Sequence, residues 1–370
     1  MTNIILSIEN LVLPRIDPSH YNYRQYRYSN NLHLSSHSMN LLKSLLITSI
    51  LASIQGYAPA KEANTSTSSK IIKVFILAGQ SNMEGHGLIK GNQNQKGTLE
   101  QLTKNPATAK NYQHLKDPEG NWKIRDDVWI SSLSKKGKLT IGGYAGRGSI
   151  GPELGFGWAV GDHFDNPILL LKFGPGGTSL AGPWRPPSSG KNENKQRGPG
   201  IGDQYDHLIS STKQQLDDLD SEFPQLKGFK FELAGFGWHQ GWNDGCSMKD
   251  SKEYESNMAN FIRDIRKDLD SPELPFVIAG SGFGGWEQKI DRRLMIMSAQ
   301  RSVAESNEFK ENAKYVETRG FFRDGPISPR PIRYHWCCNA ESYWLIGDGM
   351  GKAMIELLGG PKAPLIKDKT

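Results

Sequence analysis

Five short apolar runs recur along the second part of the chain, and each is bounded by Gly, Pro or polar residues. Runs of this length and composition are typical of strands buried in a sheet. In the first run the apolar residues stop abruptly at Gly79-Gln80-Ser81-Asn82. The pattern predicts strands at residues 71–78, 167–173, 228–238, 275–280 and 313–318.

Helical periodicity separates these predicted strands. In residues 252–270, for example, apolar residues spaced by three and four positions form an amphipathic stripe. A last helix is expected to begin after Asn339, a good N-cap residue, and to end at Gly359-Gly360. The predicted helices are residues 205–219, 252–270, 287–305 and 340–358.

Strands that alternate with helices indicate a parallel sheet covered on both faces. The sequence therefore predicts an α/β fold of three layers, α/β/α, around a central parallel sheet of about five strands. Residues 90–150 and 174–202 are rich in Gly, Lys and Asn, and we expect long loops there. Long loops in a compact domain are usually either functional or disordered.

The first 60 residues have a different pattern. Residues 1–38 are polar and show no periodicity, whereas Met39 opens a short basic head that is followed by a mostly apolar stretch and by Ala58-Pro59-Ala60. This order is typical of a secretory signal peptide, and its apolar core is shorter than the ~20 residues of a membrane span. We expect a signal peptide at 39–60 and a secreted or periplasmic protein.

The organisation that follows has five parts. We expect Met39 to be the biological start, with residues 1–38 as a non-native extension or, alternatively, a disordered arm. Asn, Ser and Thr residues mark a linker before the first predicted strand. The expected boundaries are 1–38 for the extension, 39–60 for the signal peptide, 61–70 for the linker, 71–360 for one large α/β domain and 361–370 for a tail.

Charge and cysteine content narrow the class of protein. The net charge of +6 comes from scattered Lys and Arg without a basic stripe, so we expect no nucleic acid partner. Outside the signal region no segment is apolar enough to span a membrane, and the sequence says nothing of the oligomeric state. The three cysteines, Cys246, Cys337 and Cys338, allow one disulfide and leave one thiol in an exported protein.

Residues suited to chemistry follow several predicted strands. Ser81 follows the first strand, a Gly-rich segment with Thr178 follows the second, and His239-Gln240 follows the third, while His335 precedes the last helix. The carboxyl ends of parallel strands share one edge, so these groups can converge. Each residue alone has an ordinary structural explanation, such as a helix cap for Ser81. Their coincidence at one edge favours catalysis.

The motifs in these loops resemble those of the SGNH-hydrolase superfamily, in particular the sialate O-acetylesterase and family 6 carbohydrate esterase (acetylxylan esterase-like) branch. The resemblance covers about residues 71–358 and implies a flavodoxin-like three-layer fold. The pattern G-x-S-x-G of ordinary α/β-hydrolases is absent around Ser81. The matching segments are Gly79–Met83, Gly151-Pro152-Glu153, Gly176–Leu180, Trp238–Gly241 and His335 with Asn339–Tyr343.

The resemblance implies a role for each of these residues. Ser81 attacks the ester carbonyl, and His335 acts as general base and then as general acid. The N–H groups of Ser81 and Gly151 and the side-chain amide of Gln240 hold the oxyanion, each such donor contributing roughly 3 kcal/mol. The residues expected to shape the site or contact substrate are Asn82, His239, Trp242, Asn243 and Trp336.

Two positions depart from the family pattern. Ile332 stands where many SGNH hydrolases have the Asp that orients the histidine, and Trp242 stands where the branch often has Glu. The remaining candidates for the orienting acid are Asp244, in the His-Gln-Gly loop, and Asp324, upstream of the histidine. A Ser-His dyad supported by a backbone carbonyl is the third alternative.

Cysteines flank the same loops, which suggests a hypothesis: a disulfide from Cys246 to Cys337 or Cys338 would clamp the two loops together. The spacings of His and Cys match no standard zinc pattern, and H-E-x-x-H is absent. We therefore expect no metal and no cofactor.

Together these features predict a secreted serine esterase, a carboxylic ester hydrolase that removes O-acetyl groups from a carbohydrate. The acyl group would be carried on Ser81, and the substrate would be an acetylated sialic acid, xylan or another polysaccharide. Alternatives are a lipase-like or aryl-ester SGNH hydrolase, or a catalytically silent sugar-binding protein of the same fold.

Overall fold

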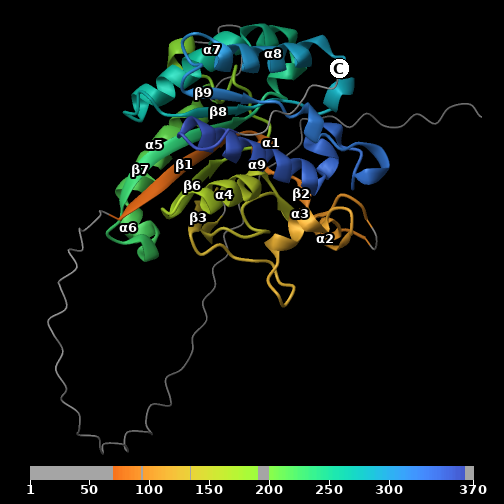
Figure 1. The fold of residues 1–370 in the computed structure, drawn as a ribbon. Helices are drawn as coiled ribbons and strands as arrows, with labels where there is room; N and C mark the ends of the chain where they lie inside the picture. The colour runs from red at the N-terminus through yellow and green to blue at the C-terminus, as the bar shows by residue number, and fades with distance from the viewer. Residues whose placement is uncertain (1–69, 93–94, 134, 191–199, 363–370) are drawn as a thin grey trace, which may run out of the picture. The chain divides into compact units, whose positions relative to one another are not determined.

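A seven-stranded sheet forms the centre of the computed structural model, which describes residues 70–92, 95–133, 135–190 and 200–362 (Figure 1). These residues all belong to one unit, Asn64–Thr370. The strand order is β4-β3-β6-β1-β7-β8-β9, and every neighbouring pair is parallel except β3 and β4. The strands are β1 (Ile71–Gly79), β3 (Val128–Ser131), β4 (Lys136–Lys138), β6 (Ile168–Phe173), β7 (Lys230–His239), β8 (Phe276–Ala279) and β9 (Ala313–Val316).

The five predicted strands are confirmed as β1, β6, β7, β8 and β9. The sheet is larger than expected because β3 and β4 extend it beyond β6, and β4 makes it mixed. β3 (Val-Trp-Ile-Ser) has an apolar run of three residues, but it lies inside the Gly-, Lys- and Asn-rich segment 90–150 that was predicted as a loop. β4 (Lys-Gly-Lys) has no apolar residue from which a strand could be predicted.

Helices cover both faces of the sheet, as predicted for three layers (Figure 1). Residues of β1 alternate between the two cores, with Phe75 and Leu77 on one face and Val74 and Ile76 on the other. The long helices are α4 (Pro152–His163) and α9 (Ala340–Leu357) on the first face, and α5 (Asp203–Asp217), α7 (Met248–Asp268) and α8 (Asp291–Glu305) on the second.

α4 was not predicted, because it is buried on nearly all sides and so lacks an amphipathic stripe. It packs against α9 through glycines. A Cβ on Gly155 would lie 2.3 Å from the backbone oxygen of Trp344, and one on Gly347 would lie 2.0 Å from that of Pro152. These contacts bring the two helix backbones together.

Shorter elements occupy the segment 90–150, which was predicted as a long loop. It contains α2 (Leu99–Lys104), α3 (Ala109–Tyr112), β3, β4 and β5 (Ser149–Ile150), the last pairing with β2 (Gly87–Leu88). The remaining short helices are α1 (Ser81–Glu84) and α6 (Leu219–Glu222).

The predicted N-terminal extension 1–38 and signal peptide 39–60 lie outside the described residues, as do 61–69 and 363–370.

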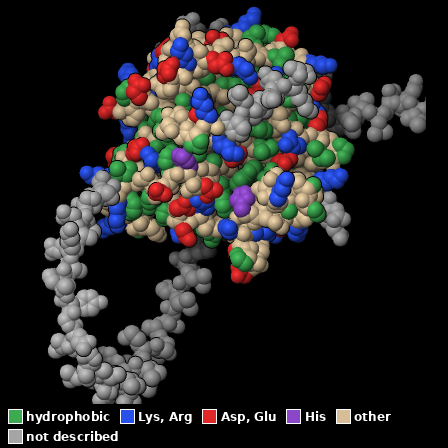
Figure 2. Space-filling view, in the orientation of Figure 1, with side chains coloured by type: hydrophobic (Ala, Val, Ile, Leu, Met, Phe, Trp, Pro, Cys, Tyr) green, Lys and Arg blue, Asp and Glu red, His purple; other side chains and the backbone are tan. Residues whose placement is uncertain are grey.

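None of the helices in the described ranges combines the length and hydropathy needed to cross a membrane. On the face drawn in Figure 2, acidic and basic side chains are interspersed rather than gathered by sign.

Candidate active site

Ser81 is the first residue of α1, directly beyond the carboxyl end of β1. The turn into α1 is tight: a Cβ on Gly79 would lie 2.1 Å from the backbone oxygen of His239, the last residue of β7. Ser81 is 8 % exposed. The first N–H groups of a helix have no intrahelical partner, and none of the described residues accepts a bond from the Ser81 N–H, so this group can bind an anion.

His335 reaches Ser81 from the segment Arg333–Cys338, 254 residues further along the chain. Its Nε2 lies 3.1 Å from Ser81 Oγ, within the reach that a general base needs. The next residues, Trp336, Cys337 and Cys338, have φ angles of 52°, 54° and 56°. Three successive non-glycine residues in the left-handed region are costly and occur where surrounding structure holds them.

Asn82 connects the two segments that carry Ser81 and His335. Its Nδ2 donates to the backbone oxygen of Tyr334 at 3.0 Å, and its Oδ1 accepts from Tyr343 Oη in α9 at 2.9 Å. Asn82 was expected to shape the site, and it does so by joining protein groups to one another.

Asp244, one of the two acids expected to orient His335, is fully buried and bonded elsewhere. Its oxygens accept from the backbone N–H groups of Leu180 and Ala181, both at 2.9 Å, and from Gln240 Nε2 at 2.6 Å. These bonds hold the carboxylate between the two strand-end loops.

Asp324, the other expected acid, also faces different partners. It pairs with Arg333, and its Oδ1 accepts from the Gly325 N–H at 2.8 Å. Among the described residues the His335 ring makes one hydrogen bond, to Ser81. Within the described ranges, neither predicted carboxylate and no backbone carbonyl therefore makes a hydrogen bond to the imidazole.

The neighbour of His335 on its ring face is His86, which the sequence analysis did not identify. The two ring centroids are 4.0 Å apart and the planes differ by 14°, a parallel stack. Burial lowers the pKa of His335 to about 4, with a smaller contribution from His86. Burial also lowers the pKa of His86 to about 4, helped by the charges of Lys172 and Arg330. Both rings are therefore neutral at pH 7.

Two of the three expected oxyanion donors are already bonded. The Gly151 N–H donates to Glu153 Oε1 at 3.0 Å. The Gln240 amide is 2 % exposed and donates to Asp244 and, at 3.0 Å, to the backbone oxygen of Thr178. The Ser81 N–H is thus the expected donor that has no competing bond in the described structure.

A Gly-rich loop borders Ser81 on another side, as the strand-end argument predicted. A Cβ on Gly176 would lie 3.8 Å from Ser81 Cβ and 3.7 Å from Glu84 Oε2. The half-buried carboxyl group of Glu84 has a pKa raised by burial, an effect that Lys172 opposes. Glu84 was also missed; its position one helical turn after Ser81 is the signal that could have identified it.

A buried ion pair contacts the end of α1, the helix that begins at Ser81. Lys172 Nζ, in β6, contacts Glu153 Oε2 at 2.6 Å and donates to the backbone oxygens of Glu84 at 2.8 Å and Tyr144 at 2.5 Å. Burial lowers the pKa of Lys172, and Glu153 opposes that shift. The pair ties the end of α1 to β6 and to the first turn of α4.

The residues expected to contact substrate differ in exposure. His239 and Trp336 are 1 % and 0 % exposed, so they pack inside the protein. Asn243 donates to the backbone oxygen of Gly177 at 2.6 Å. Trp242 is half-buried and stacks on the exposed Tyr334 ring at 4.7 Å, which makes these two rings the accessible aromatic surface beside His335.

The predicted disulfide is wrong for this structure, in which Cys246, Cys337 and Cys338 are free. Cys246 is exposed, whereas Cys337 and Cys338 are buried behind His335. Burial raises the pKa of both buried thiols. The two loops meet instead through ring contacts, Trp242 on Tyr334 and His239 near Trp336.

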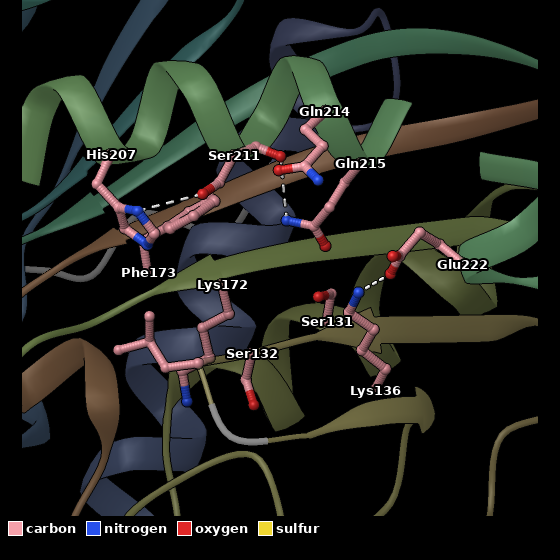
Figure 3. A pocket seen from close by; sticks show the side chains of 11 residues that line it. Ser131, Ser132, Lys136, Lys172, Phe173, His207, Ser211, Gln214, Gln215 and Glu222 are labelled. Carbon is pink, nitrogen blue, oxygen red and sulfur yellow. Dashed lines mark hydrogen bonds and ion pairs between the residues drawn. The ribbon is translucent and has the colours of Figure 1, made fainter. Parts of the chain in front are cut away.

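A polar hollow of about 230 Å³ opens between the carboxyl ends of β3 and β6 and helix α5 (Figure 3). Hydroxyl and amide side chains surround it, including Ser131, Gln214 and Gln215, and Lys136 pairs with Glu222 at its rim. It lies at the same edge of the sheet as Ser81, since Phe173 in its wall pairs with Ala78 of β1.

Comparison with known proteins identifies the class and then the family. Residues 71–355 match the family model described as carbohydrate esterase, sialic acid-specific acetylesterase. The chain therefore belongs to this family and is a carboxylic ester hydrolase, and the resemblance predicted from the sequence is confirmed.

Proteins similar to the chain include a curated relative and two solved structures. A protein of Arabidopsis thaliana named "Probable carbohydrate esterase" is 25% identical over 224 residues, which are 59% of this chain and 72% of the relative. A solved Arabidopsis thaliana structure is 17% identical with a TM-score of 0.47, covering 77% of this chain and 98% of that one. A carbohydrate acetylesterase from Xanthomonas citri is 15% identical with a TM-score of 0.44, covering 77% and 56%.

Proposed function

We propose that this carbohydrate esterase removes O-acetyl groups from a sugar through an acyl-enzyme on Ser81, with His335 as its base. The observation that carries the proposal is the 3.1 Å contact between Ser81 Oγ and His335 Nε2. A neutral imidazole can accept the hydroxyl proton, and burial keeps His335 neutral at pH 7 by lowering its pKa to about 4.

The chemistry follows in two halves. Ser81 Oγ attacks the acetyl carbonyl while His335 takes its proton, and collapse of the tetrahedral intermediate breaks the ester C–O bond. The leaving sugar oxygen receives that proton from His335. Water then attacks the acetyl-serine, passes a proton through His335 to Ser81, and releases acetate.

The oxyanion would form against the Ser81 N–H at the start of α1, where the helix dipole also favours negative charge. Gly151 and Gln240 remain candidates for this role only if substrate displaces their present bonds to Glu153 and Asp244. The aromatic surface of Trp242 and Tyr334 offers a face for a sugar ring.

The substrate we propose is an acetylated carbohydrate, such as an acetylated sialic acid, xylan or another polysaccharide. Sugar hydroxyls need polar partners, and the Glu84 carboxyl group beside Gly176 and Ser81 is suited to accept their hydrogen bonds. We also propose that the protein is exported, on the basis of the signal-peptide pattern at residues 39–60.

Hydrolysis of p-nitrophenyl acetate by the wild type, Ser81→Ala and His335→Ala tests the mechanism. Both variants should lose at least about 10³-fold in kcat. Rates at the uncatalysed background in all three proteins would favour a catalytically silent sugar-binding protein. Equal rates above the background would show that Ser81 and His335 are not the catalytic pair. Release of acetate from acetylated sialic acid and from acetylated xylan then identifies the sugar, and a preference for octanoate over acetate esters would favour a lipase-like enzyme.

A further inference from the structure

We propose that His86 is a positioning residue for His335, and that its ring face orients the imidazole, a task usually given to a triad carboxylate. This inference rests on the proposed Ser81–His335 mechanism. The ring of His86 fixes the plane of the His335 ring and keeps water from its face.

The geometry around His335 leaves this role to His86. The His335 ring has one hydrogen bond among the described residues, to Ser81, and one parallel ring contact, the stack on His86 at 4.0 Å and 14°. Tyr334 meets it at an angle of 61° with ring centroids 4.5 Å apart. A parallel stack at this distance fixes the tilt of the His335 ring, to which none of the described carboxylates makes a hydrogen bond.

The backbone around His86 is closely confined. Gly85 has a φ of 97°, and a Cβ on it would lie 2.2 Å from Gly151 Cα. On the other side, a Cβ on Gly87 would lie 3.0 Å from Ala340 Cα. The Gly85 backbone oxygen also accepts from the Gly146 N–H at 3.0 Å. His86 is thus presented from a segment that has no room to shift, as a positioning residue requires.

Charges decide which of the two rings takes a proton. Lys172 of β6 and Arg330 of the segment before His335 both disfavour a proton on His86, while Glu84 lies two residues away on its own segment. His86 Nε2 is buried and has no partner among the described residues, so a proton there would be an unsatisfied donor. His86 therefore stays neutral and presents an uncharged ring face to His335.

Two substitutions of similar size separate stacking from simple space filling. His86→Phe keeps an aromatic face and His86→Leu does not, and both are compared with the wild type and with a control at an exposed histidine, His207→Ala. With p-nitrophenyl acetate, we expect His86→Phe to retain kcat within about threefold and His86→Leu to lose about tenfold or more, with little change in KM. The acid limb of the pH profile should move up only in His86→Leu.

The variants distinguish a failure of the proposed Ser81–His335 mechanism from a failure of the proposal for His86. Activity that survives Ser81→Ala would refute the mechanism, whatever His86 does. If Ser81 is essential but His86→Phe and His86→Leu have equal kcat and equal acid limbs, the proposal for His86 is overturned. Should the leucine variant melt early, NMR titration of the His335 ring in Ser81→Ala, with and without His86→Phe, decides. An unchanged ring pKa and line width support the proposal, and a pKa near 6.5 or a broadened ring signal overturns it.

Discussion

Asp244 shows how a residue in the expected loop can serve a different purpose. It follows the His-Gln-Gly motif by three positions, and its carboxylate is buried against two backbone N–H groups and Gln240. A carboxylate that accepts several such bonds fixes loop geometry, because each buried donor would otherwise be unsatisfied. Asp244 therefore serves to fix the two loops.

Substitution of the two aspartates should separate structure from chemistry. Asp244→Asn places a donor against Leu180, Ala181 or Gln240, so we expect a loss of about 2–4 kcal/mol in unfolding free energy together with lower kcat. The Asp324 carboxylate is half-exposed and paired with Arg333, so Asp324→Asn should change the unfolding free energy and kcat only slightly. Urea unfolding and kcat for p-nitrophenyl acetate measure both. A kcat loss confined to Asp324→Asn would restore Asp324 as the orienting acid.

The contact between Ser81 and His335 could be predicted at this scale, whereas their surroundings could not. Both residues follow from rules that depend on strand ends and on a family motif. The stack of His86 on His335 depends instead on loop backbone geometry, including the left-handed turn at Trp336–Cys338. No local pattern of residue types encodes such an approach.

At the scale of elements, the helices and strands that could be predicted are those with one buried face or a continuous run of apolar residues. α5, α7, α8 and α9 lie within a few residues of their predicted ranges. α4 was missed because its glycines pack against α9 and its surface is apolar nearly all round. β4 was missed because an edge strand gains its hydrogen bonds from β3 without needing apolar residues.

The ion pair between Lys172 and Glu153 connects three elements, and its loss should affect both stability and activity. Lys172→Met leaves the Glu153 carboxylate buried without its cation, so we expect a loss of about 3–5 kcal/mol in unfolding free energy. The end of α1 also loses its bond from Lys172 to the Glu84 backbone oxygen, which should lower kcat.

A second variant provides the control for this pair. Lys172→Met combined with Glu153→Gln removes the uncompensated charge, so part of the lost stability should return while kcat stays low. Urea unfolding gives the free energies, and p-nitrophenyl acetate gives kcat. If the single variant is as stable as the wild type, the pair does not hold these elements together.

At the scale of the whole molecule, buried neutral histidines link the stability of the fold to pH. His239 is 1 % exposed, and its Nδ1 lies 3.3 Å from the Ala279 backbone oxygen, an acceptor, so Nδ1 carries the proton. Its Nε2 is buried without a partner among the described residues. Burial accordingly lowers the pKa of His239 to about 4, as it does for His86 and His335.

The unfolding free energy should therefore fall as the solution is acidified. Below the ordinary histidine pKa of 6.5 the unfolded chain takes up protons, whereas folded His239 stays neutral until its pKa of about 4. The stabilisation is complete above pH 6.5 and is lost between pH 6.5 and 4, by about 3 kcal/mol for His239 alone. His86 and His335 act in the same direction, less strongly because they are less buried.

Urea unfolding at pH 7 and pH 4.5 measures this loss of unfolding free energy. We expect the full loss in the wild type and in His163→Asn, an exposed control, and a smaller loss in His239→Gln. The same pH dependence in all three proteins would show that His239 does not provide the link.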